Sequence, residues 1–127
     1  MKLVGTHPIH TDRLVLRRWS VDDAQQMYDN LASDTEATRF VTWPPHPNVD
    51  ATRLLLTGWV HGYGDPAIFN WAVWLDEVII GQIAVVDVDT RVNLAELGYC
   101  FGRRWWNHGY ATETVKAVMS YLFDTAQ

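Results

Sequence analysis

Cysteine is nearly absent from this sequence, which has one, Cys100, in 127 residues. A single thiol excludes an internal disulfide framework and a zinc site built from several cysteines, and it favours a reducing compartment such as the cytoplasm. Positive charge is also scarce: ten Lys and Arg face fifteen Asp and Glu, for a formal net charge of −5. A general nucleic-acid-binding domain carries the opposite balance, so we expect no nucleic-acid partner.

Long apolar runs are missing as well. No stretch approaches the roughly 20 apolar residues that a membrane span requires, and the first ten residues lack the apolar centre of a signal peptide. The five histidines are scattered without metal-ligand spacing, so we expect neither a membrane association nor a metal site. The apolar content of 48% is typical of a soluble globular protein, and 127 residues suit one domain, taken as 1–127.

Periodicity and capping residues predict seven elements in the order β-α-α-β-β-β-α. They are a strand over 14–19, a helix from the cap Ser20 to about 33–34, a helix capped by Asn48 or Asp50 and running to about 63, strands over 69–75, 78–87 and 92–101, and a helix from 110 to about 123. Tight turns at 76–77 and 89–91 join the three central strands into an antiparallel meander. Segregated helices and mostly antiparallel strands indicate an α+β fold.

The loop over 102–109 opens directly into the last helix. A helix N-terminus presents unpaired N–H groups and a partial positive charge, and Gly109 allows a ligand to approach the backbone closely. Arg103 and Arg104 lie in the loop, and no acidic residue separates Glu96 from Glu113. These features favour a phosphorylated ligand. The alternative is an ordinary glycine before a helix, with two solvated arginines beside it.

Residues 106–113, Trp-Asn-His-Gly-Tyr-Ala-Thr-Glu, resemble the coenzyme A pyrophosphate loop of the GNAT superfamily of N-acetyltransferases, in the form found in the ribosomal-protein N-terminal acetyltransferase branch. Segments 11–17, 80–83 and 95–99 resemble the first, third and fourth strands of that branch, and the resemblance covers about 11–126. It implies a GNAT-like sheet flanked by helices and acetyl-CoA as cofactor. The acceptor it implies is a primary amine, on either a protein N-terminus or a small molecule.

The resemblance also implies roles for individual residues. The expected cofactor contacts are the backbone N–H groups of His108, Gly109, Tyr110, Ala111 and Thr112 at the pyrophosphate, the backbone of Cys100 and Phe101 at the pantetheine arm, and Arg103 or Arg104 at a more distal phosphate. One backbone N–H of the Cys100–Phe101 pair would hold the developing oxyanion. Trp43 and the proline-rich loop after it are either a wall of the acceptor pocket or a rigid surface loop.

Glu96 is the candidate general base. Strand alternation places it on one face with Gly98 and Cys100, and partial burial there would raise its pKa toward neutrality, which suits removal of a proton from an ammonium. The alternatives are an ion pair with Arg17 or Arg18, or a position at a wet cleft edge. We expect Cys100 to be a packing residue rather than a nucleophile.

The chain ends at Gln127, whereas a member of the family normally continues through a fifth strand, another helix and two more strands. The fourth strand would then be an open edge, to be covered by a second copy in a homodimer or by a complementing chain. A truncated domain that self-associates and has little or no activity is the alternative to a working enzyme. An unrelated phosphate-binding module is disfavoured by the ordered set of motifs.

Overall fold

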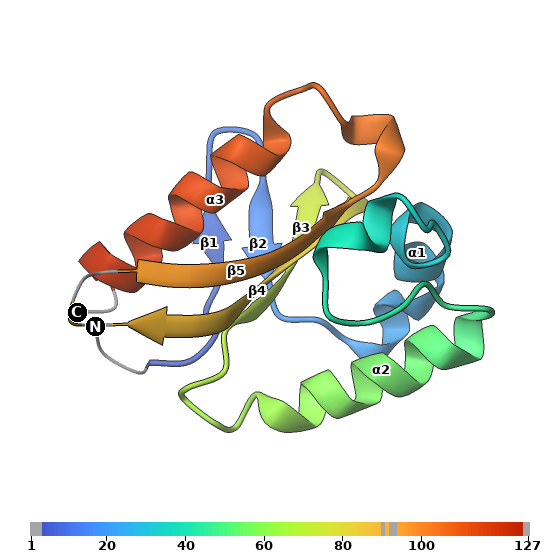
Figure 1. Cartoon of the computed structure of the whole chain (residues 1–127), viewed down its shortest axis with the longest axis horizontal. Helices are drawn as coiled ribbons and strands as arrows, with labels where there is room; N and C mark the ends of the chain where they lie inside the picture. Colours follow the sequence, from blue (N-terminus) through green and yellow to red (C-terminus); the bar gives the residue numbers. More distant parts are fainter. Residues whose placement is uncertain (1–3, 90, 92–93, 126–127) are drawn as a thin grey trace.

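Five antiparallel strands form one sheet in the order β1-β2-β3-β4-β5, in a computed structural model that describes residues 4–89, 91 and 94–125 (Figure 1). The strands are β1 (Ile9–His10), β2 (Val15–Arg17), β3 (Asn70–Leu75), β4 (Val78–Asp89) and β5 (Leu94–Phe101). The α-helices are α1 (Ala24–Met27), α2 (Val49–Gly62) and α3 (Tyr110–Ser120), with 3₁₀ turns at Val21–Asp23, Ala37–Phe40 and Arg103–Trp105, and π-helical turns at Tyr28–Ala32 and Tyr121–Thr125.

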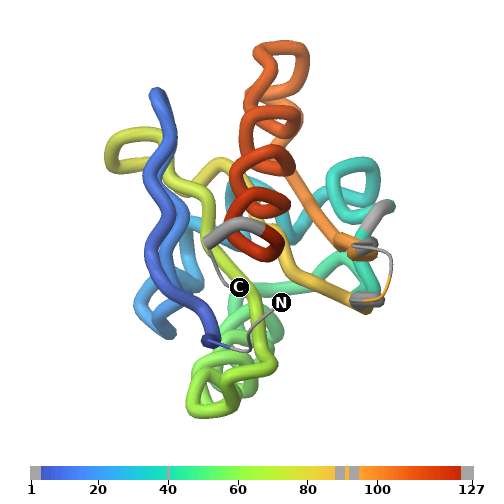
Figure 2. The backbone as a smooth tube through the Cα atoms, turned by 90° about the vertical axis from the view of Figure 1, so that its left-hand side faces the viewer, coloured from blue at the N-terminus to red at the C-terminus, as the bar shows by residue number. Residues whose placement is uncertain are grey.

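Each face of the sheet carries its own core. Trp71 and Val73 of β3 point to one face, where they pack with Val118 of α3 and with Leu122 in the turn after it. Ala72, which lies between them, points to the opposite face, toward α1 and α2. In Figure 2 the red helix α3 and the green helix α2 lie on opposite sides of the strands. The sheet is therefore the middle of three layers, which confirms the α+β class.

The meander of β3, β4 and β5 is confirmed, including the turn at 76–77, where Asp76 has a φ of 53°. The strand expected over 14–19 is shorter, and β1, which pairs with it, was not predicted, because two residues are too few to show a period. Thr90 and residues 92–93 lie outside the described residues. The turn at 89–91 and the expected strand start therefore stay predictions.

The predicted helix caps are confirmed. Ser20 forms a reciprocal capping box with Asp23, and the Asn48 side chain accepts a hydrogen bond from the N–H of Ala51 at 2.9 Å, which selects Asn48 over Asp50 as the cap. The first helical segment has the expected extent but starts as a 3₁₀ turn and ends as a π turn. Among the described residues, no helix has both the length and the apolar character that a membrane crossing needs.

Tyr63 ties three elements together at the end of α2. Its buried hydroxyl accepts a hydrogen bond from the N–H of Trp19 at 2.8 Å and donates one to the carbonyl of Asn70 at 2.9 Å. Burial raises the pKa of Tyr63 to about 12, so the hydroxyl stays protonated and can serve both partners. This single group fixes α2 against the segment after β2 and the first residue of β3.

Replacing Tyr63 by Phe should therefore lower the free energy of unfolding by about 1–3 kcal/mol, because the buried N–H of Trp19 loses its acceptor. Urea unfolding of the two proteins measures the difference. Tyr28→Phe is the matched control, since that hydroxyl makes only an exposed 3.3 Å bond to the Pro47 carbonyl, and it should change stability by less than about 0.5 kcal/mol. Equal effects of the two substitutions would contradict this account of Tyr63.

Candidate functional site

The loop before α3 has a backbone shape that few residues adopt. Asn107 and Gly109 have φ values of +67° and +80°, in the left-handed region where glycine is unstrained and asparagine is enriched. The first helical bond runs from the N–H of Glu113 to the carbonyl of Gly109 at 3.0 Å. Within the described part of the chain, the N–H groups of Tyr110, Ala111 and Thr112 ahead of it have no protein acceptor, as at a helix N-terminus without a side-chain cap.

Arg13, in the turn between β1 and β2, holds this loop from behind. Its Nε and Nη2 both lie 2.7 Å from Oε1 of Glu113, and its Nη1 donates to the carbonyl of His108 at 2.9 Å. The guanidinium also stacks over the ring of Tyr110 at 4.4 Å. One cation thus contacts three residues of the loop and the first turn of α3.

The other oxygen of Glu113, Oε2, accepts hydrogen bonds from Thr11 Oγ1 at 2.5 Å and from the N–H of Arg13 at 3.1 Å. Partial desolvation alone would raise the pKa of Glu113, but these bonds outweigh it and hold the pKa below its usual value. The carboxylate is therefore charged but neutralised by Arg13, so it does not oppose an anion at the same helix end. Arg13 was not predicted as a site residue, because no local pattern connects residues 100 positions apart.

Arg103, one of the two arginines expected at a more distal phosphate, is paired with a carboxylate. Its guanidinium forms a two-point pair with Asp34, from Nε to Oδ2 at 2.5 Å and from Nη2 to Oδ1 at 2.7 Å. The bond from Arg103 is the main reason that the pKa of Asp34 lies below its usual value. Arg104 lies against the ring of Trp105 at 5.0 Å. The Arg103–Asp34 pair therefore joins the end of β5 to the segment after α1. Of the two arginines, only Arg104 has no carboxylate partner among the described residues.

The direction of the backbone N–H groups along β5 corrects the expectation that the backbone of Cys100 contacts the pantetheine arm. The N–H of Gly102 donates to Ile80 of β4 at 2.9 Å, so the N–H of Cys100, two residues earlier, also faces β4, where Cys100 is paired with Gln82. Phe101 directs its backbone groups to the outer edge, and its carbonyl there accepts a bond from the Trp106 indole at 2.8 Å. Of the two predicted residues, Phe101 alone presents an N–H at the outer edge.

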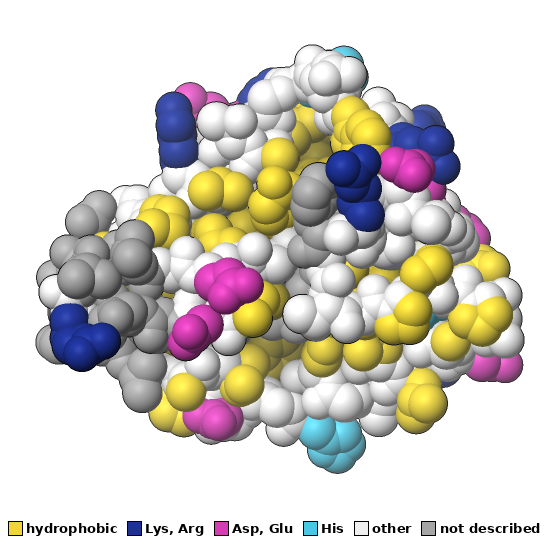
Figure 3. Space-filling model, in the orientation of Figure 1, with side chains coloured by type: hydrophobic (Ala, Val, Ile, Leu, Met, Phe, Trp, Pro, Cys, Tyr) yellow, Lys and Arg dark blue, Asp and Glu magenta, His cyan; other side chains and the backbone are white. Residues whose placement is uncertain are grey.

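Two adjoining hollows of about 300 and 220 Å³ lie along this edge and the start of α3. Phe101, Trp106 and Ala111 line both of them, and Gly109 and Thr112 line the first. Figure 3 shows apolar side chains gathered where the molecule is hollowed beside α3. The free N–H groups of the helix end thus open onto a largely apolar groove beside β5.

The side chain of Cys100 points the other way and is 1% exposed, in the core under α1 and α2. Burial raises the pKa of its thiol to about 12, so the thiolate is not populated near neutral pH. The expectation of a packing residue is confirmed. Trp105 also packs inward, since its ring fills the space in which a side chain at Gly102 would stand.

Glu96 is exposed, so the predicted burial is wrong. β5 is the last strand of the described sheet, and a side chain in the middle of an edge strand need not be covered. The alternative pairs are not formed either: Arg17 stacks over Trp74 at 3.8 Å, and Arg18 donates to the carbonyl of Thr6 at 2.8 Å. The wet cleft edge is the alternative that fits.

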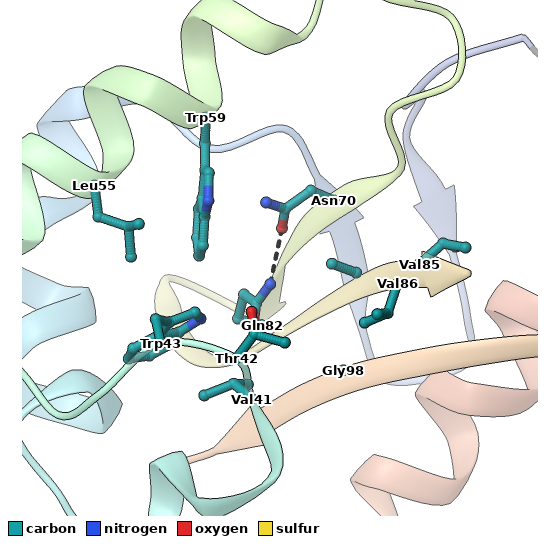
Figure 4. Close-up of a pocket in the computed structure, with 11 residues that line it drawn as sticks. Val41, Thr42, Trp43, Leu55, Trp59, Asn70, Gln82, Val85, Val86 and Gly98 are labelled. Carbon is teal, nitrogen blue, oxygen red and sulfur yellow. Dashed lines mark hydrogen bonds between the residues drawn. The ribbon is translucent and has the colours of Figure 1, made fainter.

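A second cavity, of about 270 Å³, lies on the α2 side of the sheet (Figure 4). Its lining comes from the loop before α2, from α2 itself and from three strands: Val41, Thr42, Trp43, Leu55, Trp59, Asn70, Gln82, Ala84, Val85, Val86 and Gly98. Trp43 is thus a cavity wall, whereas the prolines that follow it do not line the cavity. Gly98 lies two residues from Glu96 on the same face of β5, so the carboxylate stands at one end of the cavity. Among the described residues, no group of three or more His, Cys, Asp and Glu could hold a metal ion.

Comparison with known proteins supports the resemblance to the GNAT family over most of the chain. The family model described as acetyltransferase (GNAT) domain matches residues 13–127. The uncharacterized N-acetyltransferase p20 of Bacillus licheniformis is 28% identical over 117 residues, which cover 91% of this chain and 65% of that protein. The chain therefore spans about two thirds of the length of this curated relative.

Solved structures share the fold. A GNAT-family acetyltransferase from Bacillus anthracis superposes with a TM-score of 0.73 at 21% identity, over 94% of this chain and 68% of that one. RimL, a ribosomal α-N-protein acetyltransferase in complex with coenzyme A, gives a TM-score of 0.74 at 13% identity, over 91% and 67%. With the family model spanning nearly the whole sequence, these matches establish that the chain belongs to the GNAT acetyltransferase family.

Proposed function

We propose that this chain binds acetyl-CoA and takes part in transfer of the acetyl group to a primary amine. The observation that carries the proposal is the left-handed turn at Asn107 and Gly109, which aims the unpaired N–H groups of Tyr110, Ala111 and Thr112 into a groove beside the outer edge of β5. An anion fits this helix end, because the carboxylate in the first turn of α3, Glu113, is neutralised by Arg13.

Each part of the groove suits a part of the cofactor. The N–H groups from His108 to Thr112 would hold the pyrophosphate, and the apolar stretch along Phe101, Trp106 and Ala111 would take the pantetheine arm. The outward N–H of Phe101 would donate to the thioester oxygen and stabilise the negative charge that develops there. When bound, acetyl-CoA supplies the activated acetyl group and a thiolate that leaves as the new amide bond forms.

Glu96 would act as the general base. It stands exposed at the end of the cavity on the α2 side, so its carboxylate can take the ammonium proton through a water molecule. The free amine would then lie near the edge of β5 at which the Phe101 N–H would hold the thioester. Both an acceptor from the cavity and a cofactor in the groove would reach the same strand.

The outer edge of β5 is also suited to pairing with a further chain segment. Within the described part of the chain β5 pairs with β4 alone, and an uncovered strand edge favours pairing with another chain. We propose that a second copy or a complementing chain covers it. Light scattering on the sample used for binding separates the two: a dimer of the pure chain supports the second copy, and a monomer that binds acetyl-CoA only with an added chain supports complementation.

Gly109→Val tests the loop. A β-branched residue at a φ of +80° costs about 1–3 kcal/mol, so the loop should leave this shape, and affinity for acetyl-CoA should fall at least about tenfold. Isothermal titration measures the affinity. Gly64→Ala is the control, because a methyl group there meets nothing within 4 Å. Unchanged binding by Gly109→Val would remove the loop from the cofactor site.

Arg13→Ala tests the support behind the loop. Without the guanidinium, the carbonyl of His108 and the carboxylate of Glu113 lose their partner, and we expect acetyl-CoA affinity to fall on the order of tenfold. Glu113→Gln, which keeps the side-chain shape, should weaken binding less, because it also removes a negative charge near the phosphates. Arg53→Ala removes an exposed arginine paired only with Asp50 on α2 and should bind like the parent protein. Equal affinities for the Arg13 and Arg53 variants would show that the loop does not need this support.

Glu96→Gln tests the base. Loss of general-base catalysis should lower the turnover number about 10²–10⁴-fold at neutral pH, with acetyl-CoA affinity preserved. The rate is measured by steady-state kinetics on the active form, either the dimer or the complemented chain, with an amine that this form acetylates. Glu77→Gln, an exposed carboxylate in the β3–β4 turn, is the control and should keep full turnover. A Glu96→Gln rate equal to that of the control would exclude Glu96 from the reaction.

A further inference from the structure

The walls of the cavity on the α2 side are aromatic and held in place. Trp59 descends from α2 toward Trp43, with ring centroids 6.2 Å apart and planes at 66°, and Trp19 packs on Trp59 at 6.0 Å (Figure 4). Trp43 is supported in turn by the ring of His46 at 5.0 Å. Supported rings do not collapse into a space beside them. The cavity therefore presents a preformed apolar slot to a flat group.

The floor of the cavity holds one polar atom with an unmet bond. Gln82 is 2% exposed, and its Nε2 donates to Oδ1 of Asn70 at 3.0 Å, the bond drawn in Figure 4. Its Oε1 has no hydrogen-bond donor among the described residues. A buried acceptor without a donor costs free energy, which a ligand N–H in the cavity would recover.

Acidic residues lie beside the cavity on two neighbouring strands. Glu96 lies two residues before Gly98 on the cavity face of β5. Asp87 of β4 pairs with Glu96 in the ladder, so the two carboxylates share that face. Acidic side chains are visible over β4 and β5 in Figure 3. The exposed carboxylate of Glu96 therefore favours a cationic group on this face, and the faces of the aromatic rings add to that attraction.

We propose that the acceptor is a small primary amine joined by a short chain to an aromatic ring. The ring packs against the wall formed by Trp43 and Trp59. An N–H of the amine donates to Oε1 of Gln82, the residue of β4 that pairs with Cys100 of β5. The cavity volume of about 270 Å³ is just below the roughly 300–1,000 Å³ of small-molecule sites, which favours a compact amine over a polypeptide N-terminus. This inference rests on the proposed acetyl transfer and names its acceptor.

Direct binding tests it without turnover. Isothermal titration of 2-phenylethylamine, ethanolamine and a tetrapeptide beginning with serine should show at least tenfold tighter binding of 2-phenylethylamine than of the other two. Trp59→Ala should abolish that preference. Gln82→Leu should weaken 2-phenylethylamine and ethanolamine alike and keep their ratio, because it removes the contact to the shared amine. Leu54→Ala, at a side chain 76% exposed on the outer face of α2, should bind like the parent protein.

The outcomes separate this inference from the proposed function. Acetyl-CoA binding together with equal affinity for 2-phenylethylamine and ethanolamine would overturn the inference and leave acetyl transfer standing. A ring preference that depends on Trp59, in a chain that does not bind acetyl-CoA, would support the amine site and contradict the transfer. Tighter binding of the tetrapeptide than of 2-phenylethylamine would assign the cavity to a polypeptide acceptor and overturn the inference as well. Circular dichroism of each variant identifies any loss of fold that would mimic a loss of binding.

Discussion

The guanidinium of Arg13 holds together the segment on which the cofactor proposal depends. Two residues in left-handed conformations, Asn107 and Gly109, give the loop its shape, and such conformations persist where surrounding contacts determine them. Arg13 supplies those contacts through the carbonyl of His108 and the carboxylate of Glu113. The direction of the N–H groups at the start of α3 is thus set by a turn from the opposite end of the chain. Because Arg13 neutralises the carboxylate of Glu113, it also reduces the repulsion that an anion at this helix end would meet.

The register of β4 and β5 organises the second half of the site. Because Cys100 pairs with Gln82, the Phe101 N–H faces the outer edge, and the Glu96 side chain faces the α2 side, where Gly98 lines the cavity. One strand therefore borders both the groove proposed for the cofactor and the cavity proposed for the acceptor. A slip of one residue would turn the Glu96 side chain away from the cavity.

The sequence predicts those features whose determinants are local. The caps Ser20 and Asn48 and the meander from β3 to β5 are set within a few residues, and the structure has them. The contacts between Arg13 and Glu113 and between Arg103 and Asp34 join positions 100 and 69 residues apart, with no periodic signal to connect them. The predicted burial of Glu96 failed for a related reason. Strand alternation shows which residues share a face but not whether another layer covers that face.

A family resemblance therefore describes the cofactor loop of the site better than it describes the acceptor cavity. The loop from Trp106 to Glu113 is one continuous segment, so a short motif carries most of its geometry. The cavity is assembled from Trp43, Trp59 and Gln82, which lie on three separate elements. Substitutions at these three positions would change the shape and polarity of the cavity without altering the loop. An acceptor preference can thus change while the cofactor loop stays the same, and the acceptor of this chain has to be inferred from its own side chains rather than from its relatives.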